Sequence, residues 1–294
     1  MRFSLPNPPC NLKSLSFRKV LAGRFPNFYA SFTSIAFLQR IYIFRITESN
    51  LNFLFWLYFI LTGKHVFRKG FTLSNYGVWL ATRPNDLTYT FCLDAKYGNR
   101  LERLLHSISD KTTFVDIGAN IGVFSLVAAQ NQNISAIHSF EPDLENFEYL
   151  VKNIQRNDSS RTILHNHAIS ERKGEATLSK IPGHSGASRI LSDELNMSSP
   201  FTSVSIVNHT YLDSVFGSLE EKYFVKIDVE GHEFEVLKTL KNALFFQFIQ
   251  DFYVEFDNSF GRVSEVERFL IENGFVELSR WGKESHWDSH WVRV

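Results

Sequence analysis

The stretch TFVDIGANIGVFSLVAAQN, residues 113–131, decides how this chain folds. It opens with β-branched and aromatic residues that predict a buried strand of a parallel sheet: Phe114, Val115, Ile117. Gly118 and Gly122 then bracket a tight turn, and the apolar run 123–129 predicts a helix packed against the sheet. This arrangement lets the backbone approach a nucleotide-like ligand at the helix start. We therefore expect a ligand to bind at this turn.

The spacing of the glycines separates the classes of ligand. A dinucleotide fingerprint has the form G-x-G-x-x-G, and a phosphate-binding P-loop continues with Gly-Lys-Ser/Thr; neither occurs here. Asp116 lies two residues before Gly118, where a carboxylate would repel a pyrophosphate but would suit the amino group of a cationic ligand. The turn is therefore expected to bind a ligand that carries a positive charge.

Three motifs in order carry a family resemblance. The segment D-I-G-A-N-I-G at 116–122 is followed by Phe-Glu-Pro at 140–142 and by K-I-D-V-E-G at 226–231. Together they resemble the FkbM family of class I methyltransferases. The resemblance implies an α/β, Rossmann-like sheet that is mostly parallel, with a C-terminal antiparallel strand. It also implies S-adenosylmethionine as the cofactor.

Charge is distributed unevenly along the 294 residues, although the net charge is zero. Residues 1–70 contain ten Lys or Arg and one acidic residue, Glu48, and this asymmetry favours an anionic partner for that part. Cys10 and Cys92 are the only cysteines, and their separation favours free thiols in a reducing, cytoplasmic compartment. No signal peptide is legible, and the longest apolar run, 53–61, is shorter than the about 18 residues that a membrane span needs.

Helical patterns at 27–44 and 52–62 follow a basic, loosely ordered start. Two interpretations are open: an aromatic cap packed on the catalytic domain, or a helical pair in peripheral contact with a membrane near lipid-linked substrates. We divide the chain into a basic, aromatic helical extension (1–70), a hairpin with a connecting helix (71–110) and the S-adenosylmethionine-binding domain (111–294). The hairpin is predicted from period-two apolar residues on either side of the turn 83–86.

Strands and helices alternate after residue 110, as in a parallel sheet with helices on both faces. Strands are expected at 135–140, 162–168, 223–229 and 248–256, with a closing pair at 275–278 and 287–294. Helices are expected at 98–108, 143–156, 232–240 and 264–273. A Gly- and Ser-rich insertion, 170–205, is interpreted as a loop that either closes over the ligands or lies on the surface.

The resemblance and the position at strand ends together indicate the cofactor site. Its predicted residues are Asp116, Gly118, Ala119, Asn120, Gly122, Glu141, Pro142 and Asp228. The turn would hold the methionine part of the cofactor, with Asp116 facing its ammonium group. Glu141 follows Gly118 by 23 residues, close to the offset of roughly 20 at which an acid meets ribose hydroxyls.

The predicted catalytic residues are Asp228, Glu230, His232 and His184. In an extended strand Lys226, Asp228 and Glu230 would point the same way, and burying three charges requires either a site or a mutual salt-bridge network. Asp228, His232 and His184, in that order, are the candidates for a general base. Arg189 is a candidate to meet an anionic group, and Glu255 to line the acceptor pocket.

Missing motifs narrow the acceptor. N-methylation would lead one to expect an Asn/Asp-Pro-Pro-aromatic tetrapeptide, and none occurs. The Pro-Cys pair at 9–10 lies outside the domain and could not serve as a cytosine-attacking thiol. We therefore predict methylation of a hydroxyl, first of a sugar in a glycan or glycolipid and second of a polyketide-type molecule. The alternatives are an NAD(P)-dependent oxidoreductase and a non-enzymic tether. No metal is expected, because His286 and His290 lack a third ligand, and no nucleic acid partner is expected.

Overall fold

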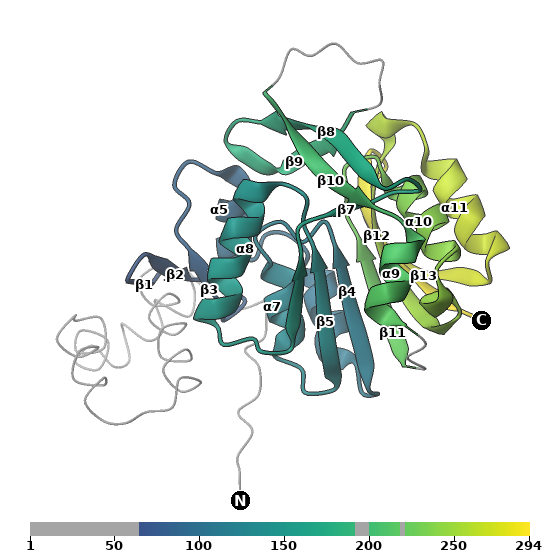
Figure 1. Ribbon diagram of the computed structural model, residues 1–294. Helices are drawn as coiled ribbons and strands as arrows, with labels where there is room; N and C mark the ends of the chain where they lie inside the picture. The colour runs from purple at the N-terminus through teal and green to yellow at the C-terminus, as the bar shows by residue number, and fades with distance from the viewer. Residues whose placement is uncertain (1–64, 192–199, 218–220) are drawn as a thin grey trace, which may run out of the picture. The chain divides into compact units, whose positions relative to one another are not determined.

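The computed structural model describes residues 65–191, 200–217 and 221–294 (Figure 1). The helices predicted at 27–44 and 52–62, and Cys10, lie outside these ranges. The chain divides into two units, Met1–Gly77 and Val78–Val294. In the first, β1 (Phe67–Arg68) pairs antiparallel with β2 (Phe71–Leu73). Within the described ranges, no helix combines the length and the apolar character that crossing a bilayer requires.

A seven-stranded sheet forms the centre of the second unit, in the order β13-β14-β12-β11-β4-β5-β6. The stretch that decides the fold supplies β4 (Thr112–Ile117), whose neighbours β5 and β11 both run parallel to it. The other strands are β5 (Ile134–Phe140), β6 (Thr162–His165), β11 (Lys222–Ile227), β12 (Ile249–Asp257), β13 (Phe275–Lys283) and β14 (His286–Arg293). In this sheet only β14 runs antiparallel to the other strands, so the predicted mostly parallel α/β sheet with a C-terminal antiparallel strand is confirmed.

Helices pack on this sheet because their apolar stripes match its apolar faces. A continuous buried cluster joins β4, β11 and β12 to α9 (His209–Phe216), α10 (Glu233–Lys241) and α11 (Val263–Glu272). Beside β4 and β5, α7 (Val123–Ala129) packs against α6 (Asn99–Ser107). The helix predicted at 143–156 is α8 (Leu144–Arg156).

In the described residues of 170–205, a second sheet replaces the predicted loop (Figure 1). Its strands, in the order β7-β10-β8-β9, are β7 (Ala168–Ile169), β8 (Gly174–Ile181), β9 (His184–Ile190) and β10 (Phe201–Val207). The small residues that suggested a loop are required by close contacts. A Cβ on Gly186 would lie 2.9 Å from the Thr88 hydroxyl, and Ser185 is buried against Asp86. The strand predicted at 162–168 is likewise divided between two sheets.

The second half of the predicted hairpin is a helix. After β3 (Trp79–Ala81), residues Leu87–Asp94 form α5. The Asp86 carboxylate accepts a hydrogen bond from the Tyr89 amide at 2.7 Å, which is the geometry of a helix N-cap. The period-two pattern was therefore wrong here, because a five-residue window of alternating residues does not outweigh a capping residue directly before it.

Candidate active site

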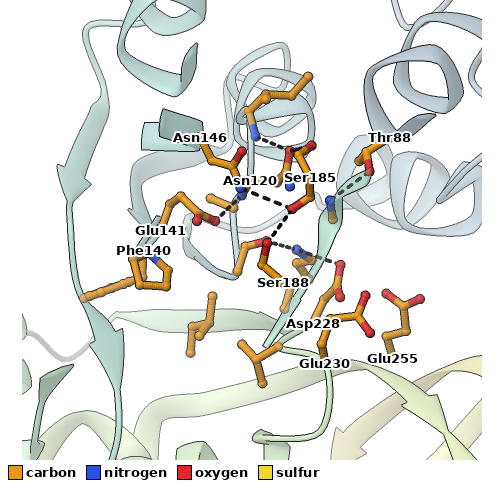
Figure 2. Close-up of a pocket in the computed structure, with 18 of the residues that line it drawn as sticks. Thr88, Asn120, Phe140, Glu141, Asn146, Ser185, Ser188, Asp228, Glu230 and Glu255 are labelled. Carbon is orange, nitrogen blue, oxygen red and sulfur yellow. Dashed lines mark hydrogen bonds and ion pairs between the residues drawn. The ribbon is translucent and has the colours of Figure 1, made fainter. Parts of the chain in front are cut away.

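A cavity of about 270 Å³ lies at the carboxyl ends of β4, β5, β11 and β12 (Figure 2). Open parallel sheets bind their ligands at this edge. Most residues predicted from the sequence line it: Gly118, Ala119, Asn120, Glu141, Pro142, His184, Asp228, Glu230, His232 and also Glu255. Asp116, Gly122 and Arg189 are not among the lining residues. The fold thus brings three distant motifs to one cavity.

The turn after β4 accepts only glycine at its two ends. Gly118 has φ +78°, and a Cβ there would lie 1.8 Å from the carbonyl oxygen of Asp228. Gly122 has φ +82°, and its Cβ would lie 2.2 Å from the Leu150 side chain. These glycines therefore let the turn contact the end of β11 on one side and α8 on the other.

Asp116 is buried and does not line the cavity. Its side chain is fully buried, it accepts a hydrogen bond from the Ser125 hydroxyl at 2.6 Å, and it lies 3.1 Å from the Lys226 ammonium. The predicted contact between Asp116 and a ligand's amino group is therefore corrected, because an internal cation already pairs with this carboxylate. For Lys226 the mutual salt-bridge interpretation is the one observed.

Glu141 lies at the tip of β5 and fixes the glycine turn. One carboxyl oxygen accepts the Asn120 amide at 2.8 Å, and the other accepts the Asp143 amide at 2.9 Å. Burial raises the pKa of Glu141 to about 7, although these hydrogen bonds act in the opposite direction. The carboxyl group lines the cavity, so its charge near neutral pH responds to whatever binds there.

Asp228 and Glu255, at the tips of β11 and β12, are joined by a residue that the sequence analysis missed. The Tyr97 hydroxyl donates to Asp228 and lies 2.9 Å from Glu255. Burial favours the neutral form of Asp228, but the Lys226 ammonium, 3.3 Å away, and the hydrogen bonds outweigh it and lower the pKa of Asp228. Burial and the charge of Asp228 raise the pKa of Glu255 well above its usual range. Asp228 thus holds the negative charge of this pair.

The chain leaves the extended conformation after Ile227, so Lys226, Asp228 and Glu230 do not alternate along one strand as predicted. Glu230 has φ +52° in the turn that precedes α10. His232, the N-cap position of α10, lies 3.2 Å from the Ser170 hydroxyl, and burial lowers its pKa. The geometry therefore gives these neighbouring residues different environments.

The second sheet closes one side of the cavity. Ser185 on β9 donates its amide and its hydroxyl to Asp86, and its carbonyl accepts from Asn146. The next amide, that of Gly186, donates to Thr88 at 2.8 Å. Isolated polar residues carry no motif, so no sequence signal pointed to Tyr97, Thr88 or Asn146 as cavity residues.

A Rossmann-like sheet with a glycine turn after its central strand, an acid at the next strand tip and a C-terminal antiparallel strand matches the class I methyltransferase fold. The family model for the methyltransferase FkbM domain matches residues 116–277, more than half of the chain. The chain therefore belongs to the FkbM methyltransferase family. This assignment replaces the oxidoreductase alternative.

Two curated proteins and one solved structure illustrate the similarity. The hexuronic acid methyltransferase AglP of Haloferax volcanii is 30% identical over 141 residues, which are 48% of this chain and 55% of AglP. Methyltransferase 1 of Beauveria bassiana is 25% identical over 191 residues, 58% of this chain and 76% of that protein. TrmK of M. capricolum, in complex with S-adenosyl-homocysteine, has a TM-score of 0.40 at 11% identity, and the match covers 66% of this chain and 68% of the TrmK chain. The chain thus spans just over half the length of AglP.

The cavity residues fit S-adenosylmethionine. Glu141 offers a carboxylate at the tip of β5, and the turn at Gly118 keeps side chains out of the space between β4 and β11. The acids Asp228, Glu230 and Glu255 line the same cavity, where Asp228 carries a negative charge that suits a positively charged sulfur. Bound there, the cofactor supplies an electrophilic methyl group.

Proposed function

We propose that this enzyme methylates a hydroxyl oxygen of a sugar in a glycan or glycolipid. The observation that carries the proposal is the row of carboxyl groups at the tips of β11 and β12, next to the glycine turn and inside the same cavity (Figure 2). Carboxylates accept hydrogen bonds from hydroxyl groups, so they can orient a sugar next to the methyl donor. In well-oriented reactions such alignment lowers the activation free energy by about 7 to 11 kcal/mol.

Two further observations support an oxygen acceptor on a sugar. The chain lacks the Asn/Asp-Pro-Pro-aromatic motif that favours N-methylation. The relative from Haloferax volcanii is named for methylation of a hexuronic acid, which is a sugar derivative. A polyketide-type hydroxyl is the second candidate acceptor, since it would make the same hydrogen bonds.

The cavity geometry supports a set of proposed cofactor contacts. Glu141 would accept hydrogen bonds from the two ribose hydroxyls while its amide contacts to Asn120 and Asp143 hold it in place. Gly118, Ala119 and Asn120 would lie against the methionine part. Asp228, fixed by Tyr97 and Lys226, would face the sulfur and the acceptor.

Labelled methyl transfer tests the proposal directly. The full chain is incubated with isotopically labelled S-adenosylmethionine and a pool of glycans and glycolipids, and the products are analysed by mass spectrometry. We expect the label on the oxygen of a sugar ring substituent. Label on nitrogen or carbon, or only on non-sugar products, would remove the sugar hydroxyl as the acceptor.

We expect Glu141→Gln to weaken S-adenosylmethionine binding by tens-fold. A hydrogen bond to a charged group contributes about 1.5–3 kcal/mol, and the amide keeps one acceptor oxygen in place of two. Calorimetry measures the affinity. The matched control is Glu145→Gln, which removes an exposed carboxylate in the first turn of α8 that does not line the cavity. Equal affinity in both variants would remove the ribose role of Glu141.

The affinity of the wild-type enzyme for S-adenosylmethionine should fall as the pH falls below about 7. Because burial raises the pKa of Glu141 to about 7, this group becomes neutral in the empty site below that pH, and binding must then remove a proton. This linkage costs about tenfold in affinity per pH unit. Calorimetric titrations from acid to mildly alkaline pH should show this slope, and Glu141→Gln should flatten it. Parallel slopes in both proteins would contradict the assignment.

A further inference from the structure

Three carboxyl groups line the end of the cavity formed by β11 and β12 (Figure 2). Two of them are engaged by the protein. Asp228 accepts from Tyr97 and pairs with the Lys226 ammonium at 3.3 Å. Glu255 is contacted by Tyr97 at 2.9 Å on one oxygen and by His286 at 2.6 Å on the other. The third carboxyl group, that of Glu230, takes no part in these contacts.

Glu230 differs from both neighbours. In the part of the chain that the structure describes, no hydrogen bond or ion pair occupies its carboxyl group, although it is partly buried and lines the cavity. Its backbone has φ +52°, a conformation that costs of order 1–3 kcal/mol for a residue with a side chain. Such strain persists only where the surroundings impose it, and it gathers at functional sites.

Contacts of the next residue, Gly231, hold this part of the turn. Gly231, the next residue, has φ +98°, and a Cβ there would lie 2.8 Å from the Phe260 ring. The Gly231 amide donates to the Glu233 carboxylate at 2.9 Å. The turn is therefore built to hold Glu230 at the cavity wall without using its carboxyl group.

We propose that Glu230 is the general base that takes the proton from the acceptor hydroxyl. This inference rests on the proposed O-methylation. The acceptor oxygen forms a bond to the methyl carbon while the carbon–sulfur bond breaks, and the electron pair of that bond stays on the sulfur. The hydroxyl proton moves to the Glu230 carboxylate, which afterwards releases it to water. The products are a methyl ether and a neutral thioether.

The acid strengths around the cavity agree with this geometry. The pKa of Glu230 is raised to about 8 by burial and by the charges of Asp228, Glu233 and Asp257, against an opposing effect of His286. The pKa of Asp228 is lowered, which makes it a weaker base. A base is most effective when its pKa lies near the working pH.

His232 and His184 are less suited to this role than the sequence suggested. The His232 ring lies 3.2 Å from the Ser170 hydroxyl through Nε2 and 3.8 Å from Glu235 through Nδ1, and burial lowers its pKa. His184 begins β9 in the second sheet and does not belong to the strand tips that carry Asp228 and Glu255. Neither histidine shares the position of Glu230 beside Asp228.

The test compares Glu230→Gln with Glu233→Gln in the full chain. Glu233 lies three residues away with a pKa raised to about 7 by burial, and it does not line the cavity. Calorimetry first establishes that each variant binds S-adenosylmethionine. The rate of label transfer to the glycan and glycolipid pool is then measured from pH 6 to about 9.

We expect Glu230→Gln to slow transfer by about 10² to 10⁴-fold and to lose the rise in rate towards pH 8. Glu233→Gln should keep the rise and move it to lower pH, since one charge that raises the pKa of Glu230 is gone. Label on oxygen with equal rates for Glu230→Gln and wild type would overturn the role of Glu230 alone, as would a wild-type rate independent of pH. Absence of label on any oxygen would instead overturn the proposed function, and this inference with it.

Discussion

Replacing Lys226 with methionine should destabilise the enzyme by about 3–5 kcal/mol, because it leaves a buried carboxylate without its counterion. Lys226 is 3% exposed and Asp116 is not exposed. The ammonium lies 3.1 Å from Asp116 and donates to the Gly118 carbonyl at 2.7 Å. Methionine fills a similar volume but provides neither contact. Urea denaturation monitored by circular dichroism measures the change in the free energy of unfolding.

The electrostatics of this buried group explain the size of the effect. Burial disfavours the ammonium, but the charges of Asp116 and Asp228 outweigh it and raise the pKa of Lys226, so the group stays protonated at neutral pH. Adding Asp116→Asn to Lys226→Met removes the unpaired charge and should recover part of the stability. If Lys226→Met were as stable as wild type, Asp116 would not depend on this cation.

Gly118→Ala should reduce S-adenosylmethionine binding by about 100-fold or more. An alanine in the left-handed conformation costs about 1–3 kcal/mol. If the turn of the variant relaxes in the empty site, cofactor binding must restore this conformation, and each 1.4 kcal/mol then lowers the affinity tenfold. In addition, the new methyl group would lie 1.8 Å from the Asp228 carbonyl oxygen. The turn and the end of β11 must therefore move apart, which separates the proposed cofactor and acceptor residues. Calorimetry and thermal unfolding measure the two consequences.

Gly274→Ala is the matched control for Gly118→Ala. Gly274 has φ +81°, close to the +78° of Gly118, but a Cβ there would meet nothing within 4 Å. Both variants introduce the same backbone strain, and only Gly118→Ala adds an overlap beside the cavity. We expect Gly274→Ala to lower the unfolding temperature without changing cofactor affinity. Full binding by Gly118→Ala would show that the turn does not hold the cofactor.

The order of the central elements was predictable because it depends on short-range patterns. The run before Gly118 is rich in β-branched and aromatic residues, so it forms the buried strand β4, and the glycine turn and α7 follow within the same stretch. The motif at 140–142 places Glu141 at the tip of β5 for the same reason. The family motifs then located most of the cavity, since parallel strands end at one edge.

The loop prediction failed because contacts from elsewhere in the chain decide that segment. The Gly- and Ser-rich insertion forms β8 and β9 because Ser185 and Gly186 fit against Asp86 and Thr88, nearly 100 residues earlier in the chain. Local composition indicates a loop whenever small residues gather. It does not encode the partner that requires them to be small.

The sequence by itself determined the parallel sheet, the glycine turn and the methyltransferase family, because strand periodicity and motif spacing are properties of neighbouring residues. Only the tertiary structure decided which carboxyl groups form hydrogen bonds or ion pairs within the protein. Tyr97 donates a hydrogen bond to Asp228, 131 residues later in the chain, and Lys226 forms an ion pair with the buried Asp116. The partners of a charged side chain depend on the packing of distant elements, and those partners set its charge and its availability.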